Sequence, residues 1–270
     1  MIDLHIHTSN SDGIYSTVEI LKIAEKEKIN TISFCDHNVL GAYEDLKKIN
    51  IKDYYSGKII TGIEFDFVYK NKNFHMLGYD FDVEKLKKSK YIDRRTSEEL
   101  IEEQEKNLEF FKNVCAKLNI KLTPNLKITY PNEHANDIIK VDMQKHEENN
   151  EIVDSILGKD RKTSFWLGHV TNPNSPFYID FTSGMPTAEE IAKDIHEAGG
   201  KVILPHVFEY KSTDNIEFLN DMYELGILDG IECVHDKHNS NQVKFLEEFC
   251  KEKNLLMTGG SDFHDDKNKF

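Results

Sequence analysis

Short stretches in which apolar residues alternate with polar ones, or follow one another, predict β-strands, because successive strand side chains point to opposite faces. They occur toward both ends of the chain, at residues 2–6, 31–35, 58–69, 73–81, 202–204, 227–233 and 255–258. A polar Lys70-Asn71-Lys72 segment separates the third stretch from the fourth and predicts a turn between two strands.

Helices are predicted between these strands. Ser16 followed by Glu19 is a capping box that begins one helix, and Thr187 followed by Glu190 begins another, which ends at Gly199. Further helical segments are predicted at residues 40–49 and 239–253. A chain in which strands and helices alternate in this way is typical of an α/β fold built on parallel strands.

The middle of the chain interrupts this alternation. Residues 83–120 are charged, with apolar side chains at helical spacing, and residues 131–185 are irregular, with proline and glycine breakers. We therefore expect a barrel domain formed by residues 1–82 and 186–270. Residues 83–185 are expected to form an inserted, mainly helical lid subdomain that covers the functional site.

Composition and charge narrow the class of protein. A chain of 270 residues with 39% hydrophobic content can bury a sizeable core, and α/β barrels reach this length as one domain. The formal net charge of −14 argues against an extended nucleic-acid-binding surface. A local cationic site for a small phosphorylated substrate remains compatible with this charge.

The four cysteines are Cys35, Cys115, Cys233 and Cys250. None forms a Cys-x-x-Cys pair, which indicates free, buried thiols in a reducing compartment. No basic segment with an apolar stretch precedes the first strand, and no apolar run approaches the ~18 residues of a membrane span. The sequence therefore predicts a soluble, cytoplasmic protein without a membrane partner.

The opening strand carries the first candidate chemistry. His5 and His7 project to the same face of that strand, and the carboxylate of Asp12 follows closely. Asp262 and His264 form a similar pair far along the chain. Imidazoles grouped beside carboxylates are typical ligands of divalent metals.

Further candidates follow other predicted strands: His37, Glu64, His75 and His206. Most candidates therefore lie near the carboxyl ends of strands, where α/β barrels place their active sites.

In order, these motifs resemble the polymerase and histidinol phosphatase (PHP) family. The matching segments are Asp3-Leu4-His5-Ile6-His7, Ser11-Asp12-Gly13, Cys35-Asp36-His37-Asn38, Gly62-Ile63-Glu64, Leu204-Pro205-His206 and Gly260-Ser261-Asp262-Phe263-His264. The resemblance implies a distorted, TIM-like (β/α)7 barrel that holds two or three divalent ions of zinc, manganese or iron.

The resemblance also implies a ligand set. His5, His7, Glu64 and Asp262 would hold one ion. Glu64 would bridge to a second ion, which His75 and His206 complete. Asp12, His37 and His264 would hold a third ion. Glu64 and Asp262 are the residues in this set to which we assign a catalytic role.

Among PHP proteins, the match looks closest to stand-alone phosphoesterases with an inserted lid. By that likeness His134 is a candidate substrate-binding residue, although a position on a surface helix explains it equally well. Two features depart from the family pattern. Pro205-His206-Val207 stands where Ala-His-Pro is usual, and the arginine often found shortly afterwards is missing from Phe208-Glu209-Tyr210.

Several polar residues are left without an assigned role. Glu232, within a predicted strand, either orients a metal ligand or is an ordinary strand carboxylate. Five histidines are expected to be ordinary solvent or core residues: His146, His169, His196, His235 and His238.

The function predicted is that of a metal-dependent phosphoesterase. Three divalent ions would exceed the charge of their carboxylate ligands, which suits a phosphate monoester dianion. The substrate would be a small phosphorylated metabolite or nucleotide, attacked by a metal-bridging hydroxide. The alternatives are an amidohydrolase-type hydrolase of a C–N bond and a non-catalytic PHP module that binds metal.

Overall fold

The computed structural model describes residues 1–131, 133–161, 164–210 and 213–265. The chain forms two compact units, Met1–Asp93 with Gly184–Phe270, and Arg94–Ser183. Our predicted insertion began earlier, at residue 83, whereas residues 83–93 belong to the first unit. The last part of the predicted barrel domain, residues 266–270, lies outside the described residues.

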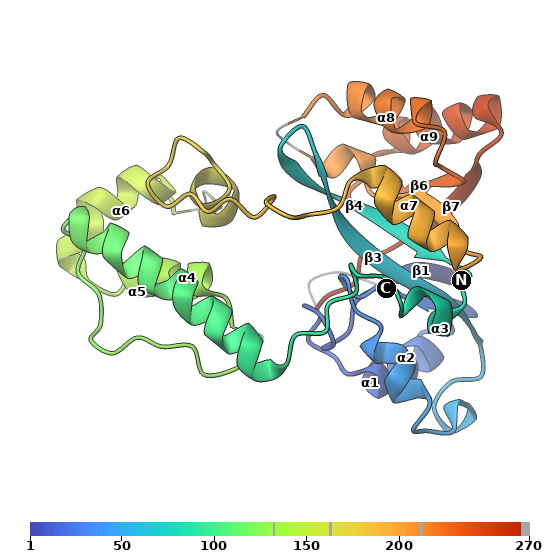
Figure 1. Ribbon diagram of the computed structural model, residues 1–270, viewed down its shortest axis with the longest axis horizontal. Coiled ribbons are helices and arrows are strands. Elements are labelled where there is room, and N and C mark those ends of the chain that lie inside the picture. The colour runs from blue at the N-terminus through green and yellow to red at the C-terminus, as the bar shows by residue number, and fades with distance from the viewer. Residues whose placement is uncertain (132, 162–163, 211–212, 266–270) are drawn as a thin grey trace. The chain divides into compact units, whose positions relative to one another are not determined.

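The first unit is built on a seven-stranded sheet whose strands lie side by side in chain order. The strands are β1 (Ile2–Ile6), β2 (Thr31–Phe34), β3 (Lys58–Tyr69), β4 (Lys72–Tyr79), β5 (Lys201–Leu204), β6 (Gly230–His235) and β7 (Leu256–Gly260). All neighbouring pairs are parallel except those that involve β4, which is antiparallel to both β3 and β5. Figure 1 shows β3 and β4 as a long hairpin.

The sheet nearly closes between its first and last strands. Beyond β7, Phe263 bridges Ile6 of β1, and its carbonyl oxygen accepts a hydrogen bond of 2.9 Å from the His7 N–H. The fold is therefore α/β with a nearly closed, barrel-shaped sheet. A regular (β/α)7 repeat is interrupted, because β3 and β4 are joined by a tight turn in which Lys70 and Asn71 both have positive φ.

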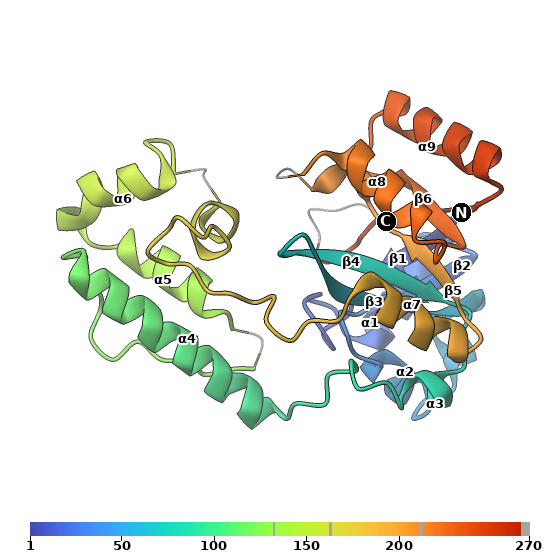
Figure 2. The same cartoon turned by 45° about the horizontal axis from the view of Figure 1, so that its top comes forward.

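Helices surround this sheet (Figure 1 and Figure 2). They are α1 (Thr17–Lys26), α2 (Gly41–Leu46), α3 (Val83–Leu86), α7 (Ala188–Glu197), α8 (Asn215–Glu224) and α9 (Ser240–Lys253), with short 3₁₀ turns at Ile51–Asp53 and Val207–Glu209. The capping boxes predicted at Ser16 and Thr187 are confirmed. The helix predicted at residues 40–49 is observed as α2, which is shorter than predicted. Helix α8 was not predicted.

The core of the first unit lies between the sheet and the apolar faces of these helices. Ile20 and Leu21 of α1 and Ile191 and Ile195 of α7 are fully buried in it. Their spacing of one residue or one helical turn places them on the helix face that meets the sheet. This packing fixes the strands, and the strand ends carry the candidate site.

The second unit is mainly helical and has a hydrophobic core of its own. It contains α4 (Ser97–Lys117), α5 (Ala135–Met143), a 3₁₀ turn (Glu147–Asn149), α6 (Asn150–Leu157) and a short π-helix (Trp166–Val170). Helices α4 and α5 pack side by side (Figure 2). Phe111, Ile139 and Phe177 are buried in this core. That this unit acts as a lid stays a prediction.

The prediction of free, buried cysteines is confirmed, since all four thiols are buried and unbridged. Within the described residues, the structure has no helix with the length and apolar character needed to span a membrane.

Candidate metal centre

The first unit carries an open cavity of about 320 Å³ at the strand ends. Its lining residues are Asp12, His37, Glu64, His75, His206, Glu209, Tyr210, Lys237, Asp262 and His264. Seven of the nine predicted metal ligands are in this lining, and the other two, His5 and His7, lie buried next to it. The structure thus brings together the residues that the sequence motifs singled out.

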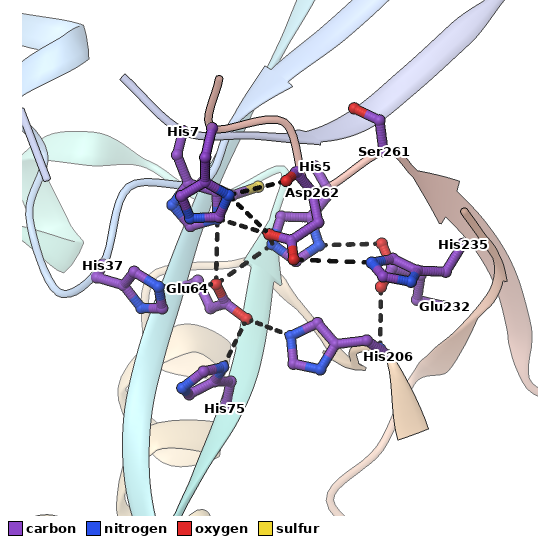
Figure 3. Close-up of polar contacts among 12 residues, drawn as sticks. His5, His7, His37, Glu64, His75, His206, Glu232, His235, Ser261 and Asp262 are labelled. Atoms are coloured by element: carbon purple, nitrogen blue, oxygen red, sulfur yellow. Dashed lines mark hydrogen bonds and ion pairs between the residues drawn. The ribbon is translucent and has the colours of Figure 1, made fainter. Parts of the chain in front are cut away.

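Glu64 is the centre of the arrangement (Figure 3). It lies in β3 and is 1% exposed, and its two carboxylate oxygens face different partners. Oε2 lies 3.2 Å from His5 Nε2 and 3.3 Å from His7 Nε2. Oε1 lies 3.2 Å from His75 Nδ1 and 2.9 Å from His206 Nε2. One carboxylate can therefore serve two adjacent groups of ligands.

Asp262 completes the first of these groups. Its Oδ1 lies 3.2 Å from His7 Nε2 and 3.5 Å from His5 Nε2. The candidate ligand atoms of His5, His7, Glu64 and Asp262 all lie within 4.8 Å of one another, as do those of Glu64, His75 and His206. Atoms at this spacing can converge on a single ion.

A third group gathers around Asp12. Its Oδ2 lies 3.1 Å from His264 Nε2 and 3.8 Å from His37 Nε2, and its Oδ1 lies 3.3 Å from His7 Nδ1. All four residues fall within the same 4.8 Å limit. His7 therefore lies between the first and the third group, a position that the motif resemblance did not indicate.

Asp66 is a candidate that sequence reasoning missed. It pairs with His75 across the β3–β4 hairpin, and its Oδ1 lies 3.3 Å from His75 Nε2. His37, Asp66 and His75 form a fourth group that could hold an ion. The signal was present in the sequence, because Asp66 is two residues after Glu64 and so points to the same face of the strand.

The electrostatics of these residues follow from their burial and mutual contacts. Burial alone would raise the pKa of Glu64, but the surrounding histidines, His5 first, hold it well below its usual value. Burial alone would lower the pKa of His75, yet Glu64 and Asp66 raise it to about 10. Burial lowers the pKa of His37.

The donor set fits divalent cations. Both ring nitrogens of the buried His7 lie 3.2–3.3 Å from carboxylate oxygens but form no hydrogen bond with them, and within the described residues Nδ1 of His37 and Nδ1 of His206 also have no hydrogen-bond partner. Leaving such buried groups without a partner is costly unless something binds them. Zinc, manganese and iron(II) all accept mixed imidazole and carboxylate ligands.

Glu232, which the sequence left open, contacts two members of the site. It is fully buried in β6, and its Oε1 lies 3.0 Å from His5 Nδ1. Its Oε2 accepts a hydrogen bond of 2.9 Å from the His206 N–H. With Nδ1 of His5 so engaged, Nε2 is left to face Glu64 and Asp262 (Figure 3).

Other carboxylates fix the backbone around the site. Asp36 accepts hydrogen bonds from the N–H and hydroxyl of Thr8 and from the Ser11 hydroxyl, which holds the loop that carries Asp12. His206 and Asp262 both adopt left-handed backbone conformations, with φ of 27° and 53°. Strained conformations of this kind concentrate at functional sites.

His235 differs from our expectation of an ordinary core or solvent histidine. It is buried beside the cluster, with Nε2 3.8 Å from Asp262 Oδ2 and its ring 5.7 Å from that of His206. His134 is exposed and precedes α5 in the second unit, outside the four groups. Its role in substrate binding stays a prediction.

Three comparisons with known proteins bear on this site. The family model of the PHP domain matches residues 3–204. A 5′-3′ exoribonuclease of Haemophilus influenzae is 24% identical over 97% of this chain and 89% of its own length. The 5′-3′ exoribonuclease Rnm of Salmonella typhimurium is 26% identical, but over only 30% of this chain and 28% of its own.

Two solved structures share the fold. One, described as a candidate metal-dependent phosphoesterase from Bifidobacterium adolescentis, is 21% identical with a TM-score of 0.64, and the match covers 99% of this chain and 90% of that one. The other, an amidohydrolase from Chromobacterium violaceum, is 19% identical with a TM-score of 0.66, over 97% and 87% of the two chains.

Proposed function

This chain belongs to the PHP domain family, and on that premise we propose that it is a metal-dependent phosphoesterase that removes a terminal phosphate from a small phosphorylated metabolite or nucleotide. The observation that carries the proposal is Glu64, whose two oxygens face two separate ligand groups. A pair of adjacent cations is an arrangement that phosphatases and nucleases use.

The residues divide into three sets under this proposal. His5, His7, Glu64 and Asp262 would hold the first ion. Glu64, His75 and His206 would hold the second, and Asp12, His37 and His264 would hold the third. Bound ions supply charge stabilisation for phosphoryl oxygens and lower the pKa of water to near neutral.

The protein's own residues supply ionised carboxylates at the site and no reactive thiol beside it. Glu64 and Asp262 keep their carboxylates ionised, since neighbouring histidines lower both pKa values although burial alone would raise them. Cys35 is the thiol nearest the motifs, but it is fully buried, donates to the Leu4 carbonyl oxygen at 3.1 Å, and has a pKa raised to about 11 by burial. It is therefore unsuited to act as a nucleophile, which favours direct attack by water.

A second candidate is the stepwise release of nucleotides from the 5′ end of RNA. The observation in its favour is the match to an exoribonuclease over 97% of this chain. Both candidates place a phosphoryl group at the same cavity, and they differ in whether the bond that breaks is a monoester or a diester. The absence of an extended nucleic-acid surface, inferred from net charge, stays a prediction.

One set of assays separates the candidates. Protein loaded with Mn²⁺ or Zn²⁺ is incubated with nucleoside monophosphates, sugar phosphates, histidinol phosphate and 5′-phosphorylated RNA in ¹⁸O-labelled water. We expect labelled inorganic phosphate from the monoesters, and a loss of about a hundredfold or more in Glu64→Gln. The control variant is Glu248→Gln, at an exposed position of α9.

Each of the other outcomes indicates a different activity for this protein. Release of nucleotides from the RNA without release of inorganic phosphate favours the exoribonuclease. Release of ammonia or an amine in a parallel incubation with C–N substrates favours the amidohydrolase. A protein that binds metal and turns over none of these substrates is the non-catalytic module. Label in the alcohol product contradicts attack at phosphorus.

A further inference from the structure

Among the described residues, the cavity lining contains one cationic side chain other than histidine. Lys237 is the only lysine or arginine among the described residues that line it. It lies two residues beyond the end of β6, and the cap of α9, Asn239, follows it. Its side chain is 44% exposed, so the ammonium group can move within the open cavity.

Lys237 faces two carboxylates without being locked to either. Its Nζ lies 3.6 Å from Glu209 Oε2 and 3.8 Å from Asp262 Oδ2, both longer than a hydrogen bond. The other oxygen of Asp262 faces His5 and His7. The Asp262 carboxylate therefore lies between the ammonium group and the rings of His5 and His7.

The position of Lys237 next to the segment after His206 bears on the arginine that this segment lacks. Phe208-Glu209-Tyr210 holds no arginine, and its one charged residue, Glu209, lies 3.6 Å from Lys237 Nζ. The lysine in the cavity lining comes instead from the loop between β6 and α9.

We propose that Lys237 binds a non-bridging oxygen of the substrate phosphate and thereby favours phosphate monoesters over diesters. The inference rests on the proposed phosphoesterase function. Above a pH of about 6 a monoester carries a second negative charge, which a diester lacks. An ammonium group attracts that additional charge and gains less from a singly charged diester.

The test compares Lys237→Met with Lys237→Arg, which keeps the charge. Lys244→Met is the matched control, because Lys244 is 74% exposed on α9 and pairs only loosely, at 3.8 Å, with Glu248. For each metal-loaded protein we would measure kcat and KM on p-nitrophenyl phosphate and on bis-p-nitrophenyl phosphate. Metal content and the affinity for inorganic phosphate, by calorimetry, are measured in parallel.

Lys237→Met is expected to raise the KM for the monoester and the dissociation constant of inorganic phosphate by about tenfold, the size of one charge-assisted hydrogen bond. The diester constants and the metal content should stay close to those of the wild type. Lys237→Arg should recover most of the phosphate affinity, and Lys244→Met should leave every constant unchanged.

Three results would overturn the proposal. They are equal losses on monoester and diester, an unchanged phosphate affinity in Lys237→Met, and a loss of metal from that variant, which would indicate a structural role beside Asp262. The failure of the proposed function looks different. A wild-type protein that turns over neither ester would refute phosphoesterase activity, while the calorimetric comparison would still decide whether Lys237 binds phosphate.

Discussion

Glu232 carries a buried negative charge that serves two neighbours at once. Burial alone would raise its pKa, but His5, followed by His235 and His206, lowers it below the usual value. Its carboxylate therefore stays ionised next to the candidate ligands. By engaging Nδ1 of His5 and the backbone N–H of His206, it orients one side chain and one strained backbone segment.

Replacing Glu232 with glutamine should weaken metal binding without leaving a cavity in the core. The amide keeps the shape of the side chain but loses the charge that stabilises the His5 tautomer, and such partners contribute about 10- to 100-fold in metal affinity. Competition with a coloured chelator would measure this change, with Glu248→Gln as the control. Unchanged affinity in Glu232→Gln would show that His5 is oriented by packing alone.

The same residues show how far a sequence can be interpreted at this scale. His5 and His7 were predictable, because their spacing within one strand determines that they share a face. Glu232 and His235 were not assigned, since their partners come from other strands; His5 is 227 residues away from Glu232. These contacts form only when the sheet nearly closes between β1 and β7 and when β5 pairs with β6.

At the scale of elements, the antiparallel β4 shapes the site. In a parallel barrel only the carboxyl ends of strands face the active site. Here β3 continues past the pairing with β2, and β4 returns along it, so that Asp66 and His75 face each other within the hairpin. The hairpin therefore supplies ligand candidates from the middle of a strand as well as from its end.

Asp229, which precedes β6, ties three elements together. Its carboxylate accepts hydrogen bonds from the Val202 N–H at 2.9 Å and from Lys201 Nζ at 2.9 Å, and it lies 2.7 Å from His196 Nε2. Burial alone would raise its pKa, but these three partners lower it below the usual value. The ionised form therefore stabilises the fold above the unfolded pKa of about 4, and this contribution is lost as the pH falls further.

Asp229→Asn should accordingly destabilise the protein by about 1–2 kcal/mol at neutral pH. The difference from wild type should shrink as the pH falls below about 4, because the carboxylate takes up a proton first in the unfolded chain and, at lower pH, in the folded protein. Urea unfolding at several pH values measures this difference, with Glu197→Gln, at an exposed position of α7, as the control. A difference that is independent of pH throughout would contradict a charge-based role.

Elements were predictable where local chemistry determines them. Ser16 with Glu19 and Thr187 with Glu190 give the helix starts that the structure shows. The direction of β4 relative to β5 was not predictable, because a strand pattern carries no information about which way its neighbour runs. Helix α8 was missed although its cap, Asp214, stands three residues before Glu217, a spacing that is typical of a helix start.

At the scale of the whole molecule, two units with separate hydrophobic cores should unfold as separate transitions. Ions held by the first unit stabilise that unit only, since a ligand adds free energy to the state that binds it. Removing them with a chelator should lower the Tm of one transition by about 5–10 °C and leave the other in place.

Differential scanning calorimetry with and without EDTA tests this expectation. Phe177→Ala, in the core of the second unit, is the complementary variant and should lower only the transition that EDTA leaves unchanged. A single transition that both treatments shift together would show that the two units unfold as one.

Because the sheet nearly closes between β1 and β7, the site can form only after both ends of the chain have been synthesised. Asp12 and His264 meet across 252 residues of chain, so at ribosomal speeds roughly ten seconds to a minute separate the synthesis of the two halves. A nascent chain exposes His5 and His7 without Asp262 and can hold ions only loosely. Any metal that this site takes up would therefore be selected after synthesis, by the finished barrel, from the ions that its surroundings supply.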